Sequence, residues 1–361
     1  MKKFFAGTAA TLAAVLFLSS PVAAISAQKA ILMDGITGQV LYEKQADSKS
    51  LIASTTKMMT AIIICEECNV LDLVEIPAEA VGIEGSSIYL QPGEKLTVQE
   101  LLYGMMLHSG NDAAAALAIY CGGSIQGFAE MMNRKAKQLK LSGTHFVNPH
   151  GLDAADHYST ARDLAIIARY AMQNPVFAQT VSTKTVRIGN RYLTNHNKLL
   201  WRVEGAEGVK TGYTKAAGRI LVSSAQRQGR RLLAVTIEDG NDWADHANLY
   251  EQGFAKFQLK NILHKGQVLG TLQVFGGTEE KVEIVSLEDF SFPLSHGEKT
   301  TIRLSKKSMV YAPVVEGADA GVAYICINGY VVGKVAVEFG KTIEQQQTAQ
   351  KKHFWQGWFG E

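Results

Sequence analysis

Residues 53–64 read ASTTKMMTAIII, and this stretch decides how the rest of the chain is interpreted. The residues that follow Lys57 are apolar nearly all round, which predicts a helix buried on every side. Lys57 comes three residues after Ser54, so in a helix the two side chains share one face. Ser54 would then lie at the amino end of the helix, where backbone N–H groups have no helical partner.

A serine hydroxyl is a weak nucleophile until a base removes its proton. Burial disfavours the charged form of a lysine and lowers its pKa, so Lys57 can act as a neutral base near physiological pH. The free N–H groups around Ser54 can stabilise an oxyanion. The pair therefore predicts serine acyl-transfer chemistry. Taken alone, the spacing arises often by chance, and the alternative is a serine cap followed by a surface lysine.

A second polar string follows another predicted helix. Residues 97–100 read TVQE, the form of a capping box, and apolar residues at helical spacing come after it. This helix should end near Ser109. Asn111 or Asp112 should then cap a further helix, which covers residues 113–120 and is closed by two glycines. Ser109 and Asn111 are thus predicted on a short connector that can face a cleft. A helix junction without a catalytic role is the alternative.

A third string, at residues 208–214, reads GVKTGYT. Residues 219–237 alternate and contain a turn glycine, which predicts an antiparallel hairpin. On a strand beside the cleft, Lys210 and Thr211 can bind a carboxylate, and Gly212 lets a substrate backbone come close. An edge strand with a solvated lysine is the alternative.

The three strings occur in the order Ser-x-x-Lys, Ser-x-Asn and Lys-Thr-Gly, the combination found in penicillin-binding proteins and class A β-lactamases. More specifically, the chain resembles the D-alanyl-D-alanine carboxypeptidases among the low-molecular-mass penicillin-binding proteins. The resemblance runs from about residue 30 to residue 257. The matching stretches are ASTTKMMTA at 53–61, MLHSGNDAA at 106–114, FVNPHGL at 146–152 and GVKTGYT at 208–214.

The resemblance implies three catalytic residues. Ser54 attacks the carbonyl carbon between two terminal D-alanines, and Lys57 is the general base. Ser109 bridges the two lysines of the site and relays a proton to the leaving amine. Because Lys57 and Lys210 are coupled amines, the sequence leaves open which of them carries the proton at each step.

The resemblance also implies a set of substrate-binding residues. Asn111 binds the substrate amide, while Lys210 and Thr211 hold the terminal carboxylate. The oxyanion lies between the backbone N–H group of Tyr213 and that of the nucleophile, with Gly212 beside it.

Some relatives have an arginine near the substrate carboxylate where this chain has His196. Histidine titrates near neutrality, so carboxylate binding is expected to depend on pH more than usual. A loop histidine without a special role is the alternative.

We predict neither a metal nor an organic cofactor. Several histidines and aspartates crowd residues 145–157, but their spacing matches no zinc pattern. The stretch coincides with the family string at 146–152 and is expected to line the region beside the site. The residues concerned are His145, His150, Asp153, Asp156 and His157.

Four cysteines need a separate interpretation. Cys65 and Cys68 form a Cys-x-x-Cys pair, but they continue the predicted buried helix, so we expect core thiols and no redox site. Cys121 can approach that helix, and the sequence leaves open whether it bonds to Cys65 or Cys68. The state of Cys326 is also left open. Secretion would permit disulfides.

The fold class is α/β (α+β), the penicillin-binding and β-lactamase-like transpeptidase fold, in which helices flank an antiparallel sheet and a small C-terminal all-β domain follows. We expect strands at 29–34 and 39–43 on one edge of the sheet and the 219–237 hairpin at its centre. A helix at 242–257 covers one face, and residues 53–173 form a helical half. The cleft lies between the halves, with the nucleophile at its floor.

From about residue 265 the chain becomes strand-like. An Asn-Gly step at residues 328–329 lies between two β-branched runs and is the strongest hairpin signal in the sequence. Strands are expected at 268–275, 281–285, 301–304, 309–312, 322–327 and 330–332. This domain suits a spacer or a docking module, and nothing in it resembles catalytic chemistry.

Both ends of the chain indicate a place outside the cytoplasm. The first residues have two lysines, an apolar stretch and small residues, typical of a secretory signal cleaved after Ala24 or Ala27. The last residues have a basic pair and aromatics on one helical face, which predicts an amphipathic anchor at the outer face of the cytoplasmic membrane. A frayed tail packed on its own domain is the alternative. The expected segments are a signal peptide at 1–24, a catalytic domain at 25–262, a β-rich domain at 263–340 and the tail at 341–361.

The resemblance implies a serine-type D-Ala-D-Ala carboxypeptidase that removes the terminal D-alanine from peptidoglycan pentapeptide stems. Its partners are stem peptides, β-lactam inhibitors and the membrane face. A net charge of +2 gives no indication of nucleic-acid binding. The alternatives are a D,D-endopeptidase or β-lactamase on the same scaffold and a catalytically inactive wall-bound scaffold. The chain shows no Glu-x-x-x-Asn loop of the kind that activates water in β-lactamases.

Overall fold

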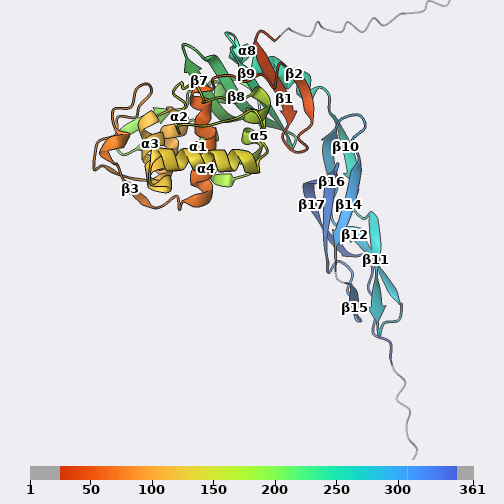
Figure 1. Cartoon of the computed structure of the whole chain (residues 1–361). Helices are drawn as coiled ribbons and strands as arrows, with labels where there is room; N and C mark the ends of the chain where they lie inside the picture. The colour runs from red at the N-terminus through yellow and green to blue at the C-terminus, as the bar shows by residue number, and fades with distance from the viewer. Residues whose placement is uncertain (1–24, 307, 348–361) are drawn as a thin grey trace, which may run out of the picture.

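The computed structural model describes residues 25–306 and 308–347. It consists of a mixed α/β body followed by an elongated body of strands (Figure 1). The expected signal peptide at 1–24 and most of the expected tail lie outside the described residues. Within the described part of the chain, no helix is both long enough and apolar enough to span a bilayer.

A five-stranded antiparallel sheet forms one half of the first body. Its strands, in the order β2-β1-β9-β8-β7, are β2 (Val40–Lys44), β1 (Lys29–Asp34), β9 (Arg230–Ile237), β8 (Gly218–Arg227) and β7 (Ala206–Thr214). The expected edge strands and central hairpin are confirmed. Helix α8 (Asp242–Phe254) packs on β8 and β9, as the pattern predicted, and ends three residues earlier than expected.

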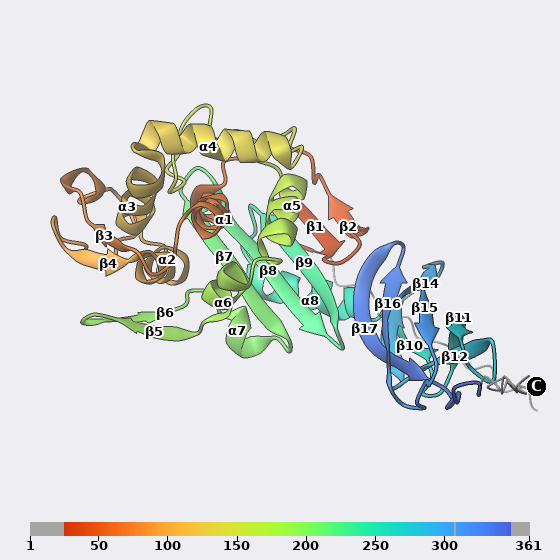
Figure 2. The same cartoon turned by 90° about the horizontal axis from the view of Figure 1, so that it is seen from below.

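Helices form the other half, around a central helix α1 (Lys57–Glu67) (Figure 2). Its first eight residues, Lys57 to Ile64, are all buried, which confirms a helix covered on every side. It packs against α2, α3, α4 and α5. The helical elements are η1 (Ala53–Thr56), η2 (Ala78–Ala80), α2 (Val98–Leu107), α3 (Asn111–Gly122), α4 (Ile125–Gln138), α5 (Ala161–Ala171), α6 (Pro175–Ser182) and α7 (Leu199–Arg202).

The ends of α2 and α3 follow the sequence signals in part. Thr97 and Glu100 form the predicted capping box at the start of α2, and Gly123 closes α3 in the left-handed conformation. The expectation that Asn111 or Asp112 caps α3 is wrong. Gly110 is the cap residue, because both polar side chains are used elsewhere in the structure.

The second body is built from strands, as expected. Its main sheet has the order β14-β16-β17-β12-β11-β15, and the hairpin at Asn328-Gly329 joins β16 to β17. The strands are β10 (Gln258–Leu263), β11 (Val268–Phe275), β12 (Lys281–Ser286), β13 (Phe290–Leu294), β14 (Thr300–Ser305), β15 (Met309–Tyr311), β16 (Asp319–Ile327) and β17 (Tyr330–Phe339). The sequence analysis missed β10 and β13, which pair with each other. Two further small sheets lie in the first body and consist of β3 (Leu73–Glu75) with β4 (Lys95–Thr97), and β5 (Thr185–Ile188) with β6 (Arg191–Thr194).

One buried arginine joins the two bodies. Arg230 donates from Nε to Asp34 at 2.6 Å and from Nη2 to Glu298 at 2.6 Å. It also donates from Nη1 to the carbonyl oxygen of Pro293 at 3.0 Å. All three charged side chains are almost fully buried. Because Asp34 lies on β1 of the five-stranded sheet and Glu298 follows β13, this contact fixes the strand-rich body to the first one.

Candidate active site

The 3₁₀ turn η1 brings Ser54 next to the start of α1. Lys57 Nζ lies 3.0 Å from Ser54 Oγ and 2.6 Å from Asn111 Oδ1. Its third partner is the carbonyl oxygen of His150, also at 2.6 Å. The amine is fully buried, whereas Ser54 is partly exposed. Ser54 therefore lies on the turn before α1 and not on the α-helix itself.

The partners of Lys57 determine how a neutral amine would be oriented. The oxygens of Asn111 and His150 can only accept hydrogen bonds, so they take the two N–H groups of a neutral amine. The lone pair then faces Ser54, whose hydroxyl is the one partner with a proton to give. Burial, followed by the charge of Lys210, lowers the pKa of Lys57 well below its usual value, while Asp112 acts in the opposite direction.

A second buried amine lies on β7. Burial lowers the pKa of Lys210 from 10.5 to about 7, and its Nζ donates to the carbonyl oxygen of Thr211 at 2.9 Å. Strand β7 packs against η1. A Cβ atom added at Gly212 would lie 3.2 Å from the carbonyl oxygen of Ile52 and 3.3 Å from the Thr55 nitrogen. A glycine at this position lets the strand approach the turn that carries the serine.

Two adjoining cavities meet at Ser54. The larger, of about 680 Å³, is lined by Ser54, Asn111 and Tyr213 together with residues 84–86 and 150–153. The smaller, of about 290 Å³, is also lined by Ser54 and Tyr213. It contains in addition Ser86, Ser109, His196, Thr211, Gly212, Arg219, Ile220, Asp242 and Trp243. The structure thus brings all eight predicted site residues together, with Lys57 and Lys210 buried beside the cavity walls.

Ser109 is 5 % exposed and holds a positive φ of 65° on the connector between α2 and α3. It lines the smaller cavity beside Thr211. Within the described residues its hydroxyl makes no hydrogen bond, so its role as a bridge between the two lysines stays a prediction.

The string at residues 146–152 supports the serine turn. Gly151 has φ +91°, and a Cβ atom there would lie 1.8 Å from the carbonyl oxygen of Ala53. Asn148 accepts a hydrogen bond from the Gly151 nitrogen at 2.7 Å. Nearby, His157 Nε2 lies 2.7 Å from Thr56 Oγ1. These contacts hold η1 in place, a role that the sequence analysis did not assign to this string.

The histidines of this region do not converge on one point. His145 Nδ1 bonds the carbonyl oxygen of Asp156, while His157 is used by Thr56 and by the Val147 nitrogen. Burial lowers the pKa of His157 to about 4. Among the described residues, no group of three metal-ligating side chains is found.

His196 lines the smaller cavity, but its ionisation differs from the expectation. Burial, followed by the charges of Lys210 and His108, lowers the pKa of His196 to about 4. The ring is therefore neutral around pH 7. From the sequence we expected carboxylate binding to depend on the titration of His196 near neutrality. In this environment His196 does not titrate near neutrality.

A cation that the sequence analysis missed, Arg219, also lines the smaller cavity. Arg219 binds Asp242 through two nitrogens, with Nη2 at 2.7 Å and 2.8 Å from the two carboxylate oxygens. Its guanidinium carbon lies 5.7 Å from the centre of the Trp243 ring. Arg219 pairs directly with Tyr213 of β7. The register of β8 against β7 was therefore the signal that could have placed Arg219 near the site.

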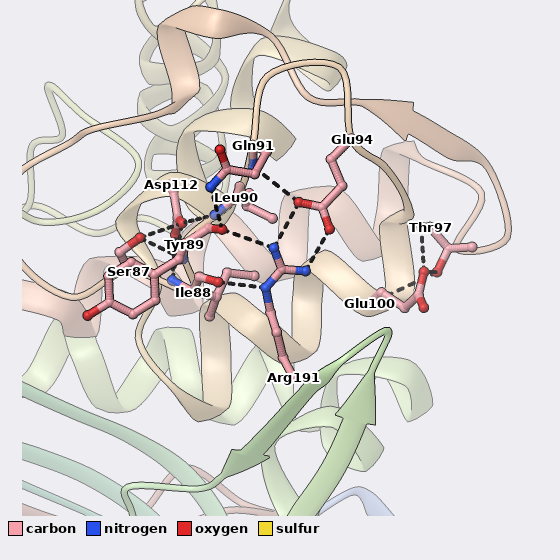
Figure 3. A network of polar contacts seen from close by, with 10 residues as sticks. All are labelled: Ser87, Ile88, Tyr89, Leu90, Gln91, Glu94, Thr97, Glu100, Asp112 and Arg191. Carbon is pink, nitrogen blue, oxygen red and sulfur yellow. Dashed lines mark hydrogen bonds and ion pairs between the residues drawn. The ribbon is translucent and has the colours of Figure 1, made fainter.

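The loop at residues 84–94, which lines the larger cavity with residues 84–86, depends on a network that the sequence analysis also missed (Figure 3). Asp112 accepts hydrogen bonds from the backbone nitrogens of Ile88 and Leu90, each at 3.1 Å. On the other side of the same loop, Arg191 from the β5–β6 hairpin binds Glu94 at 2.6 Å. The Nε group of Arg191 also donates to the carbonyl oxygen of Ile88 at 2.7 Å. The loop at residues 84–94 is therefore held from two sides.

Comparisons with known proteins agree with this site. Residues 17–241 match the family of D-alanyl-D-alanine carboxypeptidases, and residues 257–345 match the C-terminal domain of penicillin-binding protein 5. The D-alanyl-D-alanine carboxypeptidase DacF of Bacillus subtilis is 32% identical over 331 residues, which cover 86% of this chain and 84% of that protein.

Two further comparisons extend this result. DacD of Escherichia coli is 34% identical over 286 residues, covering 74% of this chain and 73% of that protein. The crystal structure of penicillin-binding protein 5 from Haemophilus influenzae superimposes with a TM-score of 0.64 at 28% identity, over 89% of this chain and 98% of that one. The chain therefore belongs to the D-alanyl-D-alanine carboxypeptidase family of low-molecular-mass penicillin-binding proteins.

Proposed function

We propose that this protein is a serine-type carboxypeptidase that removes the terminal D-alanine from peptidoglycan pentapeptide stems. The observation that carries the proposal is the position of Lys57 Nζ, 3.0 Å from Ser54 Oγ. The other two partners of the amine only accept hydrogen bonds, so a neutral Lys57 directs its lone pair at the serine. Family membership supports the choice of substrate class.

In the proposed reaction, Lys57 takes the proton of Ser54 while Oγ attacks the carbonyl carbon of the next-to-last D-alanine. The oxyanion that forms is stabilised by the backbone N–H groups of Ser54 and Tyr213. The C–N bond then breaks, and the leaving amine of the last D-alanine receives a proton through Ser109. Water then attacks the resulting ester and gives one of its protons to Oγ, which releases the shortened peptide and restores the hydroxyl of Ser54.

We assign the terminal carboxylate of the substrate to the smaller cavity. Thr211 and Lys210 are close to this position, but a pKa of about 7 leaves Lys210 only partly charged at neutral pH. An arginine side chain keeps its charge at physiological pH, and two nitrogens of Arg219 are fixed by Asp242. Arg219 therefore supplies the permanent positive charge, and Asn111 orients the amide of the peptide.

Mixing the full chain with benzylpenicillin and following its intact mass tests this proposal. A stable adduct on Ser54 together with release of D-alanine from a pentapeptide is expected. A penicillin that is hydrolysed rapidly would indicate a β-lactamase. Absence of any adduct would indicate an inactive scaffold, and digestion of cross-linked sacculi would indicate an endopeptidase.

We further propose that the protein is exported and that its tail binds the outer face of the cytoplasmic membrane. Ile25 and Ala27 are buried, and the Ser26 nitrogen donates to Asp245 at 2.6 Å. Cleavage after Ala24 would keep these contacts, whereas cleavage after Ala27 would remove them. Deleting residues 351–361 should move the protein from the membrane fraction to the soluble fraction, and an unchanged distribution would contradict the anchor.

A further inference from the structure

Helices α1 and α3 lie side by side, so that their amino ends are neighbours and their carboxyl ends are neighbours. They pack against each other, and their first residues, Lys57 and Asn111, meet in the active site. At their carboxyl ends, Cys68 is the residue that closes α1, and its backbone nitrogen donates to the Ile64 carbonyl oxygen at 3.0 Å. Cys121 is the next-to-last residue of α3. The two helices are therefore joined by polar contacts at one end and carry one cysteine each at the other.

Cys68 and Cys121 lie at these two carboxyl ends, and both side chains pack, partly buried, against the same apolar core. A hydrogen bond between them is the largest influence on both groups, and it raises the pKa of Cys68 and lowers the pKa of Cys121. Both side chains are only partly buried, so a small disulfide can reach them from solvent. A second contact ties the same region, because Tyr120 donates to Asp72 at 2.9 Å.

We propose that Cys68 and Cys121 form a disulfide bond in the exported protein, linking the carboxyl end of α1 to that of α3. The proposal rests on the extracytoplasmic location proposed above, because disulfides persist in oxidising compartments. Its effect is to close the chain segment 68–121, which contains α2 and the loop at residues 84–94, whose residues 84–86 line the larger cavity.

The oxidant is a disulfide, either of a small thiol or of a thiol-exchange protein. Cys121, as thiolate, attacks one sulfur of that disulfide, forms a mixed disulfide and releases one thiol. Cys68 then loses its proton and attacks the Cys121 sulfur, which releases the second thiol. Two protein thiols are thus oxidised and one disulfide is reduced to two thiols.

Cys65 and Cys326 provide matched controls. Cys65 lies one helical turn before Cys68, and burial, followed by the charge of Glu66, raises the pKa of Cys65 to about 12. Unlike Cys68, Cys65 has no interaction with Cys121 among the causes of its pKa shift. Cys326 lies on β16 in the other body and is buried. Neither is expected to take part in the bond.

The test uses the full chain, incubated with oxidised and reduced glutathione and then unfolded and alkylated. Two of the four thiols should be protected from alkylation, and reduction followed by a second alkylation should add two alkyl groups to the mass. Proteolysis after glutamate separates Cys65 from Cys68 and identifies the linked peptides. Cys65→Ser and Cys326→Ser should retain the cross-link, while Cys68→Ser and Cys121→Ser should lose it.

Thermal unfolding gives an independent measurement. Reduction should lower the Tm of the wild-type chain by about 5–10 °C and should leave the Tm of Cys68→Ser unchanged. Four alkylated thiols after oxidation, or a cross-link that survives Cys68→Ser, would overturn the proposal. Because thiol mapping does not depend on turnover, either result is separate from a failure of the proposed carboxypeptidase activity.

Discussion

Lys57 Nζ and Asn111 Oδ1 lie 2.6 Å apart although 54 residues separate them in the chain. The same asparagine donates from Nδ2 to the carbonyl oxygen of Glu84 at 2.5 Å. Asn111 thereby fixes the amine of the proposed base and one wall of the larger cavity. The amide cannot be turned over without losing both contacts, since its oxygen and its nitrogen are each committed.

Two substitutions of Asn111 distinguish its role in orienting the Lys57 amine from the effect of a nearby charge on the pKa of that amine. Asn111→Ala should lower kcat/KM for a D-Ala-D-Ala peptide by about 10²-fold, because the amine loses an orienting acceptor and the substrate loses a partner. Asn111→Asp keeps the acceptor and adds a negative charge that favours protonated Lys57. The rise of kcat/KM with pH should therefore move to higher pH in Asn111→Asp. Identical pH profiles in this variant and the wild type would show that Lys57 is not the titrating base.

The lowered pKa of Lys210 predicts a pH dependence of stability. The folded state holds this pKa at about 7, whereas the ordinary value is 10.5, so the unfolded state binds more protons between these pH values. Stability should therefore rise with pH across this window. Lys210→Met removes the free-energy cost of burying the amine. The variant should be more stable than the wild type at pH 7 by ~2–4 kcal/mol, and this difference should shrink towards pH 10.5. Urea unfolding at several pH values measures this.

The exposed Lys215 provides the control for that experiment. Lys215→Met should follow the wild-type pH dependence. A Lys210→Met variant that is less stable than the wild type at pH 7 would contradict the picture of a buried amine held at a cost to stability.

Arg219 predicts a difference between two substrates. Arg219→Gln should lower kcat/KM by about 10–10²-fold for a peptide with a free terminal carboxylate. The same peptide with a terminal amide should be turned over equally by variant and wild type, because it has no charge to bind. Arg227→Gln, on the same strand but paired with Glu251 at the surface, is the matched control. Equal losses on both substrates would mean that Arg219 acts on the fold and not on the carboxylate.

The sequence predicts the reacting residues of the site better than the residues that surround them. Ser54, Lys57 and Lys210 could be assigned because each lies in a short string whose spacing determines its geometry. Arg219 and Asp242 could not, because their ion pair joins the start of β8 to the start of α8, and no short string in the sequence predicts that contact.

Arg230 predicts how strongly the two bodies are joined. Arg230→Ala leaves Asp34 and Glu298 buried without their partner, which should lower the free energy of unfolding by about 3–5 kcal/mol. Arg162→Ala removes ion pairs at the surface and should cost less than about 1 kcal/mol. Urea unfolding of the intact chain compares the two. Equal losses of unfolding free energy in the two variants would show that the buried ion pairs contribute no more to stability than the surface ion pairs.

Asp112 and the helix cap illustrate why a local signal can fail. An aspartate at the start of a helix is an ordinary cap. In this fold, however, its carboxylate is taken by Ile88 and Leu90, which come from a loop more than twenty residues earlier. Long-range hydrogen bonds to a buried carboxylate outweigh the local one, and sequence spacing carries no information about them. Strands β10 and β13 were missed for a related reason, since each pairs only with the other, which lies far along the chain.

The most direct test of the account is to find where benzylpenicillin binds covalently. After incubation of the full chain with the antibiotic, the adduct should map to the tryptic peptide at residues 50–57, which contains Ser54. Lys57→Ala should slow its formation by several orders of magnitude, and Ser54→Ala should abolish it. An adduct on any other peptide, or one that forms at the wild-type rate in Lys57→Ala, would contradict the serine–lysine pair as the centre of the chemistry.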